Sequence, residues 1–276
     1  MIEILIEHEQ TIRVSVFIGL LVLLSCAEFF IPLAKRQTVR LRQWFTNLAI
    51  VVIDTLTLRL IFPLLAVGTA TYADQQGYGL FNIVDLNYWA TFIISLLALD
   101  LLIYGQHVMM HNIPMLWRLH RMHHTELSLD TTSAVRFHPL EIVLSMLIKM
   151  LFVLIMGVPA AAVILFEILL NGLALFNHSN IKFPGLIERF LRLIIITPEV
   201  HWIHHSEINA ETNSNYGFNL CLWDRLFSTY IDKPTKDYPD MRQGLREFGF
   251  EKSLSLPELI ISPFKEYPDQ KDMNEK

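Results

Sequence analysis

Long apolar runs dominate this sequence and restrict what the chain can fold into. Residues 12–34, 46–72 and 88–106 each provide the roughly 20 mostly apolar residues that a transmembrane helix needs. Residues 140–177 form a longer apolar stretch, which exceeds one span and suffices for two. Gly157 and Pro159 lie near its middle, where a hairpin would turn. The sequence therefore predicts an all-α membrane bundle of three spans and one helical hairpin.

The composition agrees with a chain that lies mostly in lipid. Hydrophobic residues make up 53% of the 276 residues and charged residues only 18%, whereas soluble domains carry about 25% charge. The net charge of −5 gives no indication of a nucleic-acid partner. Cys26 and Cys221 are too few and too far apart to form a disulfide framework.

Charged residues in the loops predict how the helices are oriented. The segment 35–42 holds Lys35, Arg36, Arg40 and Arg42, whereas the segment 73–87 contains no lysine or arginine. The positive-inside rule then places the first loop in the cytoplasm and the second on the other side. The third span and the hairpin 140–177 both return to the first side. Residues 107–139 and all residues from 178 onward are therefore expected on the cytoplasmic face.

We expect three segments along the chain. Residues 1–106 would form N-terminal transmembrane helices, and residues 107–232 would form a histidine-bearing catalytic region that includes the hairpin 140–177. Residues 233–276 are rich in charged residues and proline, so they predict a polar C-terminal tail on the surface. Residues 268–276 are expected to be disordered.

Ten of the eleven histidines lie between residues 107 and 205, and their spacing predicts a metal centre. Offsets of three and four residues place side chains on one face of a helix. Neutral imidazole is the commonest metal ligand in proteins, and eight to ten imidazoles are too many for one ion. The sequence therefore predicts two metal ions in a histidine-rich cytoplasmic cap. The candidate ligands are His107, His111, His120, His123, His124, His138, His178, His201, His204 and His205.

Other metal sites fit the pattern less well. The Glu-x-x-His pairs of carboxylate-bridged di-iron bundles are absent from these segments. The zinc-protease motif H-E-x-x-H is absent too, because Arg121 follows His120. A histidine-cage zinc hydrolase and a metal-handling membrane protein remain as alternatives. A zinc hydrolase needs fewer ligands, and a transporter would place them near the middle of the bilayer.

Three carboxylates are candidates for supporting the ligands. Asp100 lies seven residues before His107, two helical turns earlier on the same face. Glu141 follows His138 closely, and Asp224 lies near the last histidine group. Metal-bound histidines usually donate their second N–H to such an acceptor, so Asp100 and Glu141 are predicted to accept from a ligand N–H, and Asp224 is predicted to brace the last histidine group.

The histidine motifs resemble those of the fatty acid hydroxylase superfamily, which includes sterol desaturases and alkylglycerol monooxygenase. The pattern of that superfamily is H-x(3–4)-H followed by two copies of H-x-x-H-H. This chain reads HVMMH, HRMHH and HWIHH in the same order. The segments RFHPLE, FNHSN and NYGFNLCLWDRLFSTY agree as well. The resemblance runs from about residue 95 to 232.

The resemblance implies a di-iron centre on the cytosolic side that uses O2 to hydroxylate or desaturate a lipid, such as a fatty acyl, sterol or ether lipid. It implies that the histidines of the three motifs HVMMH, HRMHH and HWIHH, which we call the histidine boxes, are metal ligands. His178 in FNHSN and His138 in RFHPLE are implied as ligands too. Zinc could replace iron in purified protein. No haem-binding cytochrome b5 module or G-x-G-x-x-G fingerprint is visible. We therefore expect an external electron donor: a cytochrome b5-like protein, a ferredoxin or a reductase. The expected location is the bacterial inner membrane or the endoplasmic reticulum.

Overall fold

The computed structural model describes residues 6–250 and 253–266, and these residues form helices joined by short loops. Within the described ranges there is no β-strand, and extended pairing is limited to two isolated bridges, Ile195 with Leu220 and Ser206 with Gln243. The predicted all-α fold is confirmed. The disorder expected for residues 268–276 concerns residues outside the described part of the chain.

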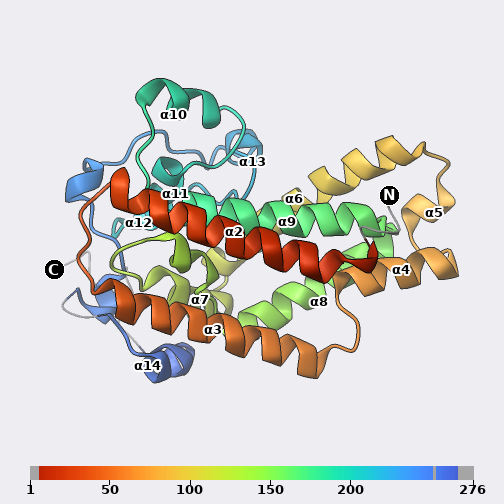
Figure 1. Cartoon of the computed structure of the whole chain (residues 1–276), viewed down its shortest axis with the longest axis horizontal. Helices are drawn as coiled ribbons and strands as arrows, with labels where there is room; N and C mark the ends of the chain where they lie inside the picture. The colour runs from red at the N-terminus through yellow and green to blue at the C-terminus, as the bar shows by residue number, and fades with distance from the viewer. Residues whose placement is uncertain (1–5, 251–252, 267–276) are drawn as a thin grey trace.

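Five stretches of the described chain are long and apolar enough to cross a membrane. They include α2 (Glu9–Phe30), α6 (Tyr88–Asn112), α8 (Pro139–Met156) and α9 (Ala160–His178). The fifth is the apolar stretch Arg40–Ile83, which contains α3 (Arg40–Ile61). Figure 1 shows these helices lying lengthwise beside one another. The chain is an integral membrane helical bundle.

The predicted span 46–72 lies within the apolar stretch Arg40–Ile83, but the structure divides it between two helices. Helix α3 ends at Ile61, and α4 (Ala66–Gln76) follows after a short extended segment. Phe62 has φ −110° and ψ 114°, the extended conformation that a following proline favours. Pro63 also lacks the N–H that a continuing helix would need. The chain then passes through α5 (Leu80–Ile83) before α6 begins.

Helix α6 continues beyond residue 106, where the sequence-based span ends. The Asn87 side chain accepts a hydrogen bond from the Ala90 N–H at 2.9 Å and caps the start of α6. The helix ends at Asn112, because Ile113 is extended and Pro114 opens α7 (Pro114–His124). His107 and His111 therefore lie on the last turns of a membrane helix rather than on a separate cap helix.

The predicted hairpin is present in the structure. Helix α8 ends at Gly157, whose φ of +67° is the left-handed conformation that glycine adopts without strain. Pro159 then precedes the first turn of α9. The loop before α6 packs tightly here: a Cβ on Gly79 would lie 2.1 Å from the Gly157 nitrogen. The hairpin and α6 share a buried core that includes Leu99, Val153 and Phe166.

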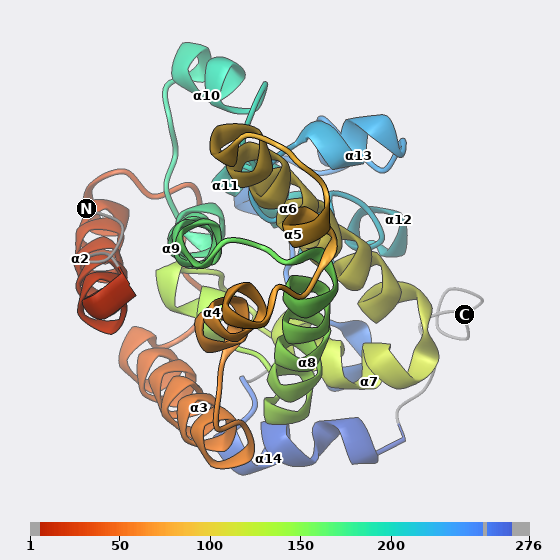
Figure 2. The same ribbon diagram turned by 90° about the vertical axis from the view of Figure 1, so that its right-hand side faces the viewer.

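The hairpin brings the start of α8 and the end of α9 to the same end of the bundle as the end of α6. Helices α7 and α11 (Pro198–His204) lie at this end, whereas α4 and α5 extend toward the opposite end (Figure 1). Figure 2 views the molecule from that opposite end, with α4 and α5 toward the reader. The predicted gathering of the histidine segments at one end is thus present, and its cytoplasmic orientation stays a prediction.

The described part of the C-terminal segment packs onto the bundle instead of extending from the surface. Helix α14 (Leu256–Ile261) buries Leu259 against Ile50 of α3 and Met122 of α7. The Arg121 guanidinium donates to the Ser262 carbonyl at 2.6 Å. The apolar residues of α14 therefore tie this segment to the helix that carries the second histidine box.

Candidate metal centre

The structure brings nine of the ten predicted histidines together in two adjoining groups. In each group, one ring nitrogen per histidine lies within 4.8 Å of all the others. All nine are buried except His111, which is half-buried. We name the groups site A and site B. Site A contains His107, His111, His120, His124 and His204, and site B contains His123, His178, His201 and His205.

Four helices supply these side chains. The end of α6 gives site A two histidines, and α7 and the end of α11 serve both sites. His124 belongs to site A and its neighbour His123 to site B, because consecutive residues on a helix point about 100° apart. His204 and His205 divide in the same way. The sites therefore adjoin: the rings of His124 and His205 stack with centroids 4.4 Å apart.

Hydrogen bonds at Nδ1 orient four of the rings. One of them, His120, donates to the Glu141 carboxylate at 2.7 Å, and the other three donate to backbone carbonyls. His107 donates to the Tyr216 carbonyl at 2.7 Å, and His204 donates to the Ser214 carbonyl at 2.7 Å. His178 donates to the Ala174 carbonyl at 2.8 Å. A carbonyl can only accept, so the proton lies on Nδ1 and the lone pair lies on Nε2. Each of these rings thus presents an unprotonated Nε2 to its site.

In site A, two ring nitrogens approach each other without a proton to share. The Nε2 atoms of His107 and His120 are 3.1 Å apart, although both rings carry their proton on Nδ1. The Nε2 of His178 lies 3.0 Å from that of His201. The Nε2 of His204 is buried and has no hydrogen-bond partner in the described chain. Facing lone pairs repel each other unless a cation lies between them, so site A fits a metal ion. Site B fits one through its four buried imidazoles, each of which brings a ring nitrogen within 4.8 Å of the others.

The electrostatics also favour the form of histidine that binds metals. Burial lowers the pKa of His204 to about 3, despite its hydrogen bond to Ser214. Burial also lowers the pKa of His123 and His205 well below the ordinary value, and repulsion from the neighbouring imidazoles lowers it further. The rings are therefore neutral near pH 7, as metal coordination requires.

His138 lies outside both groups. Its Nδ1 accepts a hydrogen bond from the Leu140 N–H at 3.2 Å, which caps the start of α8. Its Nε2 donates to the Ile260 carbonyl of α14 at 3.1 Å. Because both ring nitrogens are used within the protein, we leave His138 out of the ligand set proposed below.

The three predicted carboxylates take different positions. Glu141 contacts a candidate ligand directly, since its Oε1 accepts from His120 Nδ1 at 2.7 Å. Asp224 accepts from the N–H groups of Tyr216 and Gly217, both at 2.8 Å. It therefore holds the loop whose carbonyls orient His107 and His204. Asp100 accepts from the Trp223 indole at 2.8 Å and fixes α13 (Leu222–Leu226) behind that loop.

Several neighbours of the sites were not found by sequence reasoning. Phe137 stacks on His123 with ring centroids 4.4 Å apart, and Trp117 lies 4.9 Å from His111. The carbonyls that orient the rings carry no side-chain signal. The exception is Ala174, which lies four residues before His178 on the same helix, so helix geometry alone could have indicated it.

Comparison with known proteins gives one family and several relatives. The family model described as fatty acid hydroxylase matches residues 92–229, which is half of the chain. The chain is 28% identical to the ornithine lipid hydroxylase OlsE of Rhizobium tropici, over 60% of this chain and 49% of that protein. It is 29% identical to human alkylglycerol monooxygenase, over 56% of this chain and 34% of that protein.

A third relative is the fatty acid hydroxylase vlmA of Lecanicillium sp, at 27% identity over 64% of this chain and 52% of that protein. The chain thus spans about half or less of the length of these curated relatives. No solved structure matches the chain. The matched region contains all nine histidines of sites A and B.

Proposed function

Because this chain belongs to the fatty acid hydroxylase family, we propose that it is a membrane-bound oxidoreductase that holds two iron ions and uses O2 to hydroxylate a C–H bond of a membrane lipid. The observation that carries the proposal is the pair of adjoining histidine sites, and in site A the unprotonated Nε2 atoms of His107 and His120 face each other. The relatives named above are hydroxylases or a monooxygenase, which favours hydroxylation over desaturation.

The nine histidines of sites A and B are the proposed ligands. Imidazole suits Fe, Zn, Cu and Ni, and the family favours iron among these. When bound, the two ions would supply O2 activation and oxidation of the C–H bond. The chain itself fixes the ring orientations: Glu141 keeps the proton of His120 on Nδ1, and the loop held by Asp224 does the same for His107 and His204.

A lipid substrate agrees with where the sites lie. They sit at the ends of the membrane helices α6 and α9, near the expected level of the lipid headgroups. Met109 and Ile113, which flank His111, are 41% and 43% exposed and offer an apolar surface to lipid. The basic segment 35–42 lies at this end of the bundle and supports a cytoplasmic active site. Electrons would come from an external donor protein.

Metal analysis of anaerobically purified protein, combined with oxygen uptake, tests this function. We expect about two iron ions per chain, oxygen consumption that depends on a reductant and on added membrane lipid, and a lipid product heavier by one oxygen atom. Zinc at both sites with lipid hydrolysis and no oxygen uptake would instead support the zinc-hydrolase alternative. Metal uptake without any lipid turnover would support a metal-handling protein.

A further inference from the structure

Two short helices outside the five membrane-crossing stretches expose several large apolar side chains. In α10 (Gly185–Leu191), Leu186 and Phe190 are 71% and 69% exposed. In α13, Leu226 is 63% exposed. Single exposed apolar residues are ordinary, whereas a contiguous group of them marks a surface that a membrane or another molecule covers.

Two hydrogen bonds join α10 and α13 into one surface. The Cys221 N–H donates to the Ile194 carbonyl at 3.0 Å, and the Arg225 side chain donates to the Arg192 carbonyl at 2.9 Å. Figures 1 and 2 both show α10 and α13 along the upper side of the molecule, away from α3 and α14. We call this region the α10–α13 surface, and it comprises residues 182–194 and 222–227.

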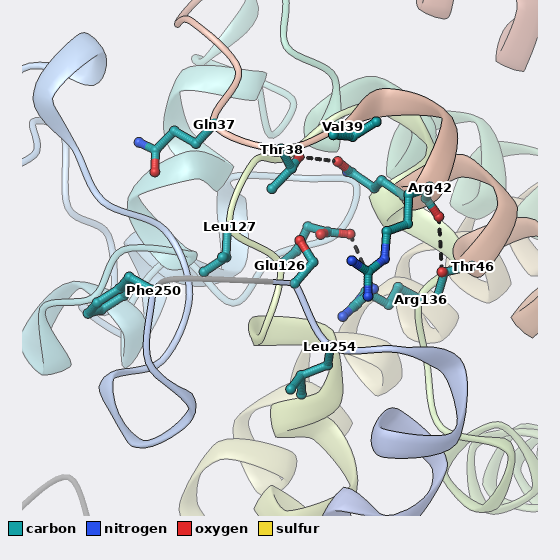
Figure 3. A pocket seen from close by; sticks show the side chains of 12 residues that line it. Gln37, Thr38, Val39, Arg42, Thr46, Glu126, Leu127, Arg136, Phe250 and Leu254 are labelled. Carbon is teal, nitrogen blue, oxygen red and sulfur yellow. Dashed lines mark hydrogen bonds and ion pairs between the residues drawn. The ribbon is translucent and has the colours of Figure 1, made fainter.

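The α10 part of the surface lies at the level where α2 leaves the membrane. The backbone N–H of Lys182 donates to the carbonyl of Ile31, the residue that follows α2, at 2.8 Å. In Figure 1, α10 reaches no further toward the histidine end than α2 does. At that end Arg42 and Thr46 line a polar cavity of about 200 Å³ at the start of α3 (Figure 3), which marks the polar boundary of the bundle. Helix α10 therefore lies beside the spanning helices rather than beyond them.

The α13 part of the surface packs against a spanning helix. The Trp223 indole donates to Asp100, near the middle of α6, at 2.8 Å. The Phe227 ring stacks on Tyr104 of α6 with ring centroids 5.5 Å apart. A helix as short as α13 cannot cross a bilayer, so its outer face continues the lipid-facing side of α6 within one leaflet.

The charges of the α10–α13 surface fit an anionic bilayer. Its exposed charged residues are all cations: Lys182, Arg189 and Arg225. Its two acidic residues, Glu188 and Asp224, are buried. Glu188 accepts from Arg192 at 2.7 Å, and Asp224 accepts from backbone N–H groups. Apolar side chains flanked by exposed lysine and arginine are typical of segments that lie in the interface of a membrane with anionic lipids.

We propose that the α10–α13 surface lies in the plane of the membrane and inserts its apolar side chains into the leaflet at the histidine end. Phe190 and Leu226 contact acyl chains, and Lys182 and Arg189 contact the phosphate groups of anionic lipids. Because α13 also carries Asp224, which holds the loop that orients two ligands of site A, this contact fixes the depth of the metal centre relative to the lipid. The contact itself requires neither metal nor turnover.

Nitroxide labels on the purified full-length chain test the insertion. Single cysteines would replace Phe190 or Leu226 in a Cys26→Ser background, in which the buried Cys221 stays. The protein would be reconstituted in vesicles of phosphatidylcholine and phosphatidylglycerol. We expect both labels to collide more often with oxygen, which concentrates in lipid, than with a water-soluble nickel chelate.

Two exposed positions provide the controls for these collision rates. A label at Val52, which is 56% exposed within α3, should behave like a lipid-facing residue. A label at Asp240, in the polar segment after the matched region, should collide more often with the nickel chelate. The proposal is overturned if positions 190 and 226 behave like position 240. It is also overturned if they are protected from both reagents and show spin–spin coupling, because a second copy of the chain then covers the surface.

A fluorophore at position 190 tests the contact with anionic lipids. Phosphatidylglycerol with a nitroxide on its acyl chain should quench it more than phosphatidylcholine with the same nitroxide at equal mole fraction. Replacing both Lys182 and Arg189 with glutamine should remove most of this excess, since basic residues attract anionic lipids locally. Arg59→Gln removes an exposed cation from the far end of α3 and should leave the excess unchanged. Equal quenching by the two lipids, or equal effects of the two variants, would refute the contact with anionic headgroups.

Discussion

His120 Nδ1 donates to Glu141 Oε1 at 2.7 Å, and this bond joins a candidate metal ligand on α7 to the first turn of α8. Glu141 lies where the helix dipole favours a negative charge. The carboxylate therefore fixes the orientation of the His120 ring and makes its Nε2 a better donor to a metal. His120 is the only one of the nine proposed ligands for which the described structure records a hydrogen bond to a carboxylate.

Replacing Glu141 with glutamine should weaken metal binding at site A more than at site B. The amide can still accept the hydrogen bond but no longer carries the charge. Loss of such a partner typically lowers metal affinity about 10–100-fold. Titration against a competing chelator measures this. Glu167→Gln is the control, because Glu167 is also buried on a membrane helix but pairs with Lys149. Equal effects of the two variants would show that Glu141 does not act through His120.

Removing one histidine from each site should distinguish the two metals. His204→Ala should lower the metal content from about two ions per chain to about one, with the loss at site A, and His205→Ala should do the same at site B. Both variants should abolish activity yet still insert in the membrane, since the apolar helices drive insertion. His8→Ala should behave as wild type, because His8 is exposed at the start of α2. Full metal content in His204→Ala would contradict its place in site A.

His138→Ala should reduce stability without releasing metal. His138 caps α8 and holds the Ile260 carbonyl, and loss of a cap typically costs about 1 kcal/mol. The melting temperature and the metal content of the same sample provide the measurement. His138→Asn, which retains a capping acceptor, should recover part of the stability. A loss of one metal ion in both variants would instead make His138 a ligand, as the family resemblance implies.

Removing the metals should make the protein sensitive to mild acid. In the folded metal-free chain, burial keeps the pKa of His204 at about 3, whereas an unfolded histidine titrates near 6.5. The unfolded state therefore binds more protons below pH 6.5, and folded stability falls as the pH decreases from about 6.5 toward 3. Thermal unfolding at pH 7.5 and 5.5, with and without bound metal, tests this. An unchanged melting temperature of the metal-free protein would contradict the buried, neutral cluster.

Cysteine labelling should place the two ends of the bundle on opposite sides of the membrane. Gln75 is exposed on α4, and Lys233 is exposed two residues after Ile231, which packs near Trp202 of α11. In a background without Cys26 and Cys221, a cysteine at position 233 should react from the cytoplasmic side and one at position 75 from the other side. Labelling of both from one side would contradict the topology.

The sequence by itself determined the helical membrane fold, the hairpin turn at Gly157 and the gathering of the histidines at one end. These features depend on local properties: hydropathy, the conformation of single residues and spacing along a helix. The helix break at Pro63 is also a local feature, but hydropathy did not reveal the break because the residues on both sides of Pro63 are apolar. The packing of Leu259 and the other apolar residues of α14 onto the bundle was not predicted, because these residues lie in a segment rich in charged residues.

Only the tertiary structure decided how the histidines divide and what orients them. Helix geometry points His123 and His124 in different directions, but which site each one enters depends on where α6 and α9 place their own histidines. His138 matches a family motif, yet the packing of α14 gives its ring another partner. The carbonyls of Ser214 and Tyr216 act through backbone atoms that every residue has. Such contacts join residues far apart in the chain, so they follow from packing rather than from local pattern.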